Sequence, residues 1–335
     1  MKRSRKRIRK NRTGRNLLII IFLLVGLVAY FAPTLQHLNN YNSALKDYDF
    51  QTVAEELTWI EKKASWLKLL PFVEDGELWL KLNLGEGQSI ESQLKESDKE
   101  SHKLWLFQYY SSQGELEKAQ AVSQSLQSLG LKRLSEGLLL IQEGKYDEGA
   151  AILYTIGNSD LDTEEYIFLQ IALARSEMAL GNLAKAQRTW QLAYEKAPLH
   201  PLVKATEVDL ALVTGQWSLA QEKIEELRPL QEDSPYTTYL LVKKALLSLV
   251  LGEKENFQNT LGKLEGLPHG EGCQLYLKGI EAYGNEDFPQ AVEYLESALE
   301  KEMPKYLMRD AEVALSQASE RVQASEEIQR ITGSR

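Results

Sequence analysis

The chain has 335 residues, of which 43% are hydrophobic and 26% are charged, and this composition excludes a disordered chain and a protein with many membrane spans. The net charge of −9 is unevenly distributed, because residues 1–15 carry nine cations and no acid. Taking these nine from the 39 lysines and arginines leaves 30 cations against 48 acids, a balance of −18. An acidic body repels phosphate, which argues against a nucleic-acid partner. The single cysteine, Cys273, excludes an intrachain disulfide and a multi-cysteine metal site.

The basic residues lead directly into an apolar segment. No charged residue occurs between Arg15 and Lys46, and Leu17–Ala32 is almost wholly apolar. The nineteen residues from Leu17 to Leu35 would form a helix about 28 Å long, close to the thickness of a hydrocarbon core of about 30 Å. We therefore expect a transmembrane helix at residues 16–35.

The same segment has two other interpretations, a cleavable signal peptide and a buried soluble helix. A signal peptide requires small residues before the cleavage site, whereas cutting after Ala32 places Tyr30 at the −3 position. The nine preceding cations could also form a nuclear or nucleic-acid signal. As a topology determinant, they place the N-terminus in the cytoplasm and residues 36–335 outside it, in a single-pass protein of the cell membrane.

Glycines recur through the rest of the chain at intervals of 30 to 37 residues, at Gly114, Gly144, Gly181, Gly215 and Gly252. Each follows an amphipathic stretch and precedes a second one, and in most units a small residue follows five positions later. A glycine in the left-handed conformation ends a helix, and the small residue lets the next helix approach closely. This period predicts a solenoid of helix pairs.

Two units carry a more specific pattern. One has a small residue, an aromatic, a small residue and a proline at Ala186, Trp190, Ala193 and Pro198, and the last has Gly279, Phe288, Ala291, Leu295 and Ala298. The chain resembles the tetratricopeptide repeat (TPR) family, in particular membrane-anchored TPR proteins of bacterial type. The units of Gly114, Gly144 and Gly215 match in part, and in the Gly252 unit Phe257 occupies the small-residue position. The alternative is an irregular all-α domain with coincidental glycines.

We therefore predict an all-α chain with a single N-terminal transmembrane helix followed by an α-solenoid of TPR-like helix pairs. Its parts are a basic cytoplasmic tail at 1–15, the transmembrane helix at 16–35, degenerate helical repeats at 36–98, TPR-like repeats at 99–305, and a capping helix with a tail at 306–335. Asp162 followed by Glu165 predicts a capping box at the start of a helix that ends near Leu180.

The resemblance implies a concave wall lined by the first helix of each pair, which suits a peptide segment or an amphipathic helix. The candidates for a partner-binding groove are large side chains at the wall positions: Phe168, Ile171, Arg175, Met178, Tyr239, Tyr276 and Tyr283. The alternative for each residue is a place in the core between repeats.

No catalytic motif accompanies the repeats, so we expect no enzyme and no cofactor. His200 lies in a turn between repeats, where we expect an exposed side chain. His269 and Cys273 have the spacing of two metal ligands on one helix, but Gly-Glu-Gly separates them and no third ligand follows, so no metal site is expected.

The sequence thus predicts a membrane-anchored TPR scaffold that binds a protein or peptide partner outside the cytoplasm. The alternative is a self-associating structural subunit of an envelope or secretion assembly, without a transient client.

Overall fold

The computed structural model describes residues 31–157, 159–227 and 235–333, and every regular element among them is helical. The chain divides into two compact units, with the boundary between Leu80 and Lys81. The predicted division of the repeats at residue 98 concerns their sequence regularity and stays a prediction.

The first unit contains a helix at residues 31–46, α2 (Phe50–Lys63), the short 3₁₀ helix η1 (Ser65–Leu69) and most of α3 (Pro71–Asn83). Aromatic side chains hold it together: Tyr41 is fully buried and donates a hydrogen bond to the Val73 carbonyl, and the Phe50 ring stacks on Trp79 with 5.0 Å between centroids. The α2 helix begins at Asp49, whose carboxylate accepts the Thr52 N–H.

The prediction of a transmembrane helix at residues 16–35 is contradicted. Residues 16–30 lie outside the described residues, and residues 31–35 belong to a helix that continues to residue 46 through His37, Asn39, Asn40 and Lys46. These polar side chains lower the hydropathy of the described helix, and no helix in the described part of the chain is long and apolar enough to cross a bilayer. The single-pass topology, with a cytoplasmic N-terminus and an extracytoplasmic body, is corrected with it.

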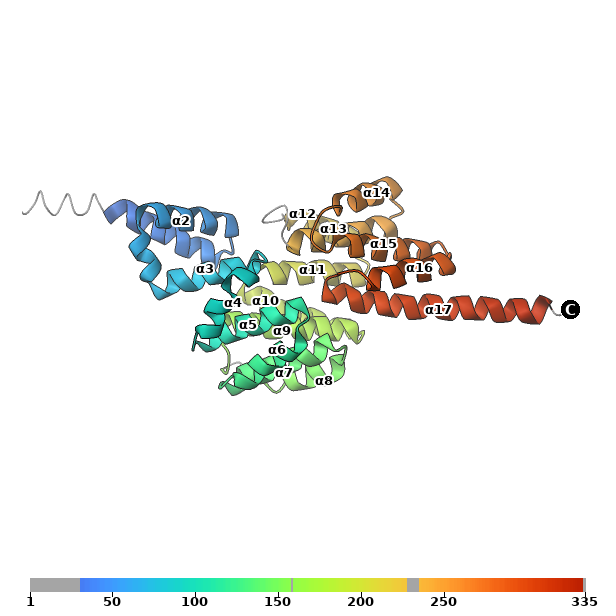
Figure 1. The fold of residues 1–335 in the computed structure, drawn as a ribbon, viewed down its shortest axis with the longest axis horizontal. Coiled ribbons are helices and arrows are strands. Elements are labelled where there is room, and N and C mark those ends of the chain that lie inside the picture. Colours follow the sequence, from blue (N-terminus) through green and yellow to red (C-terminus); the bar gives the residue numbers. More distant parts are fainter. Residues whose placement is uncertain (1–30, 158, 228–234, 334–335) are drawn as a thin grey trace, which may run out of the picture. The chain divides into compact units, whose positions relative to one another are not determined.

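The second unit is a series of helix pairs (Figure 1). In chain order the helices after α3 are α4 (Gly87–Glu96), α5 (Glu100–Gln113), α6 (Leu116–Ser125), α7 (Leu129–Gln142), α8 (Tyr146–Leu153), α9 (Thr163–Ala179), α10 (Leu183–Lys196), α11 (Pro201–Val213), α12 (Trp217–Glu226), α13 (Pro235–Val250), α14 (Lys254–Lys263), α15 (Gly270–Gly284), α16 (Phe288–Leu299) and α17 (Lys305–Gly333). From α5 to α16, consecutive helices pack as pairs, and each pair contacts the next.

The turn inside each pair is the one that the glycine spacing predicts. All five recurring glycines have φ between 70° and 78°, a left-handed conformation that costs glycine little. At Gly144, the N–H of the next residue donates to the carbonyl of Leu140, 2.9 Å away, which satisfies a carbonyl at the end of α7. The equivalent bond follows Gly181, from Asn182 N–H to the Glu177 carbonyl. The predicted capping box is also confirmed: Asp162 and Glu165 each accept the other's backbone N–H at 2.9 Å.

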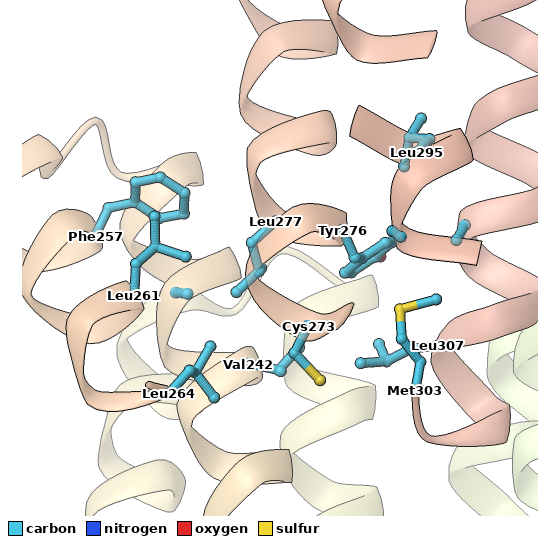
Figure 2. Packing of buried hydrophobic residues seen from close by; sticks show 13 residues of the cluster. Val242, Phe257, Leu261, Leu264, Cys273, Tyr276, Leu277, Leu295, Met303 and Leu307 are labelled. Carbon is cyan, nitrogen blue, oxygen red and sulfur yellow. The ribbon is translucent and has the colours of Figure 1, made fainter. Parts of the chain in front are cut away.

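The core of the last repeats is a continuous apolar cluster (Figure 2). It contains Phe257 on α14 together with Val242 and Ala245 on α13, so the small residue of this unit lies on the first helix instead of the second. Cys273 is fully buried in the same cluster, and desolvation raises the pKa of its thiol to about 12. No group of three or more His, Cys, Asp or Glu residues in the described ranges is arranged to hold a metal ion.

We predict that enlarging a small residue at a helix crossing destabilises the second unit. Ala186 on α10 and Ala291 on α16 are both fully buried, so a leucine side chain at either position would have to displace packed neighbours. Ala186→Leu and Ala291→Leu should each lower the free energy of unfolding by about 1–3 kcal/mol, measured by urea denaturation. The matched control is Ala184→Leu, which is exposed on the same helix as Ala186 and should be nearly neutral.

Candidate functional site

The seven predicted groove residues do not form one open wall. Four of them, Phe168, Ile171, Arg175 and Met178, share one face of α9, at three- and four-residue steps. Ile171 is buried, while the other three are half-buried. Phe168 meets the ring of His200 edge-on, with 6.0 Å between ring centroids.

Arg175 is the polar group of this face. Its Nε atom is buried and has no hydrogen-bond partner, and no carboxylate in the described part of the chain forms an ion pair with it. An unpaired donor shielded from water costs free energy that a bound acceptor would recover. The face of α9 therefore combines apolar contact area with an unsatisfied cationic donor.

Tyr239 belongs to a different environment. It is 8% exposed, and its hydroxyl oxygen lies 2.9 Å from both the Ala205 carbonyl and Asp209 Oδ1, which share its single proton as acceptors. Lys243 forms an ion pair with Asp209 at 2.9 Å and lies 5.3 Å from the centroid of the Tyr239 ring. These contacts join α13 to α11, so Tyr239 is a structural residue between two repeats.

Tyr276 and Tyr283 pack toward the C-terminal helix. Tyr276 is 4% exposed within the apolar cluster of Figure 2, and desolvation, with a smaller contribution from Asp310, raises the pKa of its hydroxyl. Tyr283 is half-buried, and its ring meets Phe288 edge-on at 5.5 Å. A separate shallow recess at the α15–α16 turn is lined by polar side chains such as Lys278, Glu281 and Asp287 and includes none of the seven.

His200 is buried, although the sequence predicts an exposed side chain in a turn. It is only 2% exposed, because it caps the start of α11. Its Nδ1 atom accepts the N–H of Leu202, and its Nε2 atom lies 3.1 Å from Glu164 Oε1 on α9. A histidine with two such partners acts as a structural link between neighbouring repeats.

A charged group on the C-terminal helix was not predictable from the sequence. Asp310, on α17, is solvent-exposed, yet the surrounding protein displaces enough water to raise its pKa, and the nearby charge of Asp209 raises it further while Lys243 opposes both. Asp209 of α11 and Lys243 of α13 form an ion pair, and Asp310 of α17 lies close enough for both charges to act on it. Nothing in the spacing of the sequence links α17 to α11.

No model of a known protein family matches the sequence, and no curated protein matches it. Among solved structures, a chain of the APC/C hetero-tetramer Cut9–Hcn1 is similar, with a TM-score of 0.55 and 16% identity over 84% of this chain. The chain spans about half the length of that protein, 55%. A tetratricopeptide repeat protein from Parabacteroides merdae ATCC 43184 is matched over 79% of this chain and 98% of its own, with a TM-score of 0.47 and 15% identity.

The fold is TPR-like. The similarity concerns the fold, because the identity is low, and it confirms the expected α-solenoid of paired helices. Stacked helix pairs of this kind curve and form an extended concave surface. Phe168, Arg175 and Met178 belong to α9, the first helix of its pair, and their place on an inner face of the repeat array stays a prediction.

We predict that Tyr239 contributes to stability and not to partner contact. Tyr239→Phe removes the hydroxyl that bonds Ala205 and Asp209, and it should lower the free energy of unfolding by about 0.5–1.5 kcal/mol. The measurement is urea denaturation, with Tyr194→Phe as a control, because Tyr194 is an exposed tyrosine on α10. Equal effects of the two substitutions would contradict the structural role.

A second prediction concerns pH. The pKa of Asp310 in the folded chain lies above its ordinary value of 3.8. At a pH above the folded pKa, the ionised carboxylate therefore lowers the stability of the fold. At a pH below the unfolded pKa, the group is protonated in both states and this penalty is lost. Asp310→Asn should therefore raise the melting temperature at about pH 7, and the difference from the native chain should vanish near about pH 3. Glu320→Gln, an exposed carboxylate on the same helix, serves as the control. A difference that grows on acidification would have the wrong sign.

Proposed function

We propose that the second unit is a protein-interaction scaffold without a catalytic role, and that the inner face of α9 holds a segment of a partner protein. The observation that carries this proposal is Arg175, a half-buried arginine with no ion pair among the described residues, between Phe168 and Met178 on one helix face. A structural arginine in such a position is normally paired, because leaving it unpaired costs free energy.

The chemistry of this face indicates the kind of segment that it accepts. A carboxylate, from an acidic side chain or a chain terminus, would pair with the planar guanidinium of Arg175 in two parallel hydrogen bonds. Phe168 and Met178 offer apolar surface on either side, and the thioether of Met178 adapts to different shapes. The partner segment therefore carries an acidic group next to large apolar side chains.

The similarity to TPR proteins supports a scaffold but does not identify its partner. The acidic body, with its balance of −18 outside the first fifteen residues, repels an acidic partner at a distance. Recognition then depends on short-range contact with Arg175, and weakening of the general repulsion by salt should help association. Such a partner binds slowly and selectively instead of being drawn in by the overall charge.

We predict that truncating this face weakens partner capture. A photo-crosslinking residue at Met178 in the full chain, followed by mass spectrometry, identifies the bound segment. Phe168→Ala and Arg175→Ala should then each reduce the affinity for that segment by about 1–3 kcal/mol, because few residues dominate an interface. The melting temperature should change little, since both side chains are half-buried.

The matched control is Arg188→Ala, which removes the same side chain from an exposed position on α10. Loss of binding in Arg188→Ala, with normal binding in Arg175→Ala, would place the interface on the second helices and refute the proposal.

A further inference from the structure

The C-terminal helix α17 makes contacts beyond the helix pair that it follows. The guanidinium of Arg309 lies against the turn between α7 and α8: a Cβ atom added to Gly144 would be 3.2 Å from Arg309 Nε and 3.3 Å from Cζ. The equivalent glycines Gly181 and Gly252 have nothing within 4 Å of such an atom. Gly144 is thus distinguished from the glycines of the other turns by its contact with α17.

The same turns of α17 are anchored a second time, on other helices. Leu307 and Ala311 are fully buried in the apolar cluster that includes Val242 of α13 and Tyr276 of α15 (Figure 2). Arg309 lies between these two residues in sequence but on another face of the helix, and it reaches the α7–α8 turn. The start of α17 therefore joins α13 and α15 to α7 and α8.

The position of α9 follows from these contacts. Among the first helices of the pairs, α9 contacts α7 on one side and α11 on the other. The pairs that begin with α9 and α11 lie between the α7–α8 pair and α13 in the array, so a segment that touches both ends spans the part of the array that contains α9. Asp310 agrees with this path, because its charge interacts with Tyr146 of α8, Asp209 of α11 and Lys243 of α13.

We propose that residues 307–312 of α17 form a strap across the inner side of the repeats, and that a partner segment reaches Arg175 and Met178 fully only when this strap opens. The inference rests on the proposed function of the α9 face, but the strap itself is a property of the free chain. Leu307 and Ala311 hold the strap in the apolar cluster, and Arg309 holds it against the α7–α8 turn.

The accessibility of α9 can be measured without any partner. A thiol introduced by Met178→Cys reports on the inner face, and native Cys273 does not interfere, because it is buried and the pKa of its thiol is about 12. The probe is a maleimide reagent on the full chain. Arg309→Ala should increase the labelling rate of the Met178→Cys thiol by about tenfold, which corresponds to about 1.4 kcal/mol in the closing free energy.

Two controls separate the strap from general loosening. Arg321→Ala, at an exposed arginine further along α17, should leave the rate at Met178→Cys unchanged. A Leu192→Cys thiol, on the exposed face of α10, should be labelled equally fast with and without Arg309→Ala. Equal labelling of Met178→Cys in the native and Arg309→Ala backgrounds would overturn the proposal.

Alanine substitutions at the turn glycines test the contact between Arg309 and Gly144 independently. Gly144→Ala, Gly181→Ala and Gly252→Ala share the same left-handed strain, but only the first places a methyl group against Arg309. Gly144→Ala should therefore accelerate hydrogen exchange in residues 307–312 more than the other two, and Arg309→Ala should remove this excess. Equal exchange in all three variants would refute the strap. If labelling and hydrogen exchange respond to the substitutions as expected but no partner crosslinks at Met178, only the proposed function is refuted.

Discussion

The close approach of the two helices in each pair is the contact on which the repeat array depends. Ala119, Ala186, Ala220 and Ala291 are all fully buried at this position of their second helices, where a larger side chain would force the helices apart. A single pair cannot bury its apolar surface alone, so each pair is completed by the next one. The crossing also fixes which side chains of each first helix are covered by its own pair and which remain for contact with other groups.

The local parts of this architecture were predictable from the sequence, because they depend on neighbouring residues only. A glycine at the end of a helix, such as Gly144 or Gly181, has its left-handed conformation dictated by the turn, whatever the rest of the chain does. The capping box of Asp162 and Glu165 is equally local. Phe257 is the exception to this local predictability, because it is a large residue at a small-residue position of the second helix. The fold accepts it because the small residue Ala245, on the first helix, lies in the same cluster.

The burial of the candidate groove residues could be predicted only in part, because it depends on helices far away in the sequence, and the groove itself stays a prediction. The pattern placed Ile171, Tyr239 and Tyr276 on the wall, but contacts with adjacent repeats bury them. One signal was available: the hydrogen bond from Tyr239 to Ala205 spans 34 residues, one repeat length, so polar pairs at this spacing indicate contacts between pairs and not ligand sites. For Asp310 no such signal exists. The apolar pattern of residues 16–35 was equally misleading for the described helix, which becomes polar from His37 onward.

The double attachment of α17 changes how the second unit responds to mechanical load. A plain array of repeats behaves as a spring, and a pull on its last helix peels the pairs off one at a time. Here Arg309 also joins that helix to the turn at Gly144, so a pull on the C-terminus is shared between the last pair and the α7–α8 pair. The helix pairs between these two points form a closed loop of contacts, which resists stretching as a unit, while the pairs before α7 remain outside the loop.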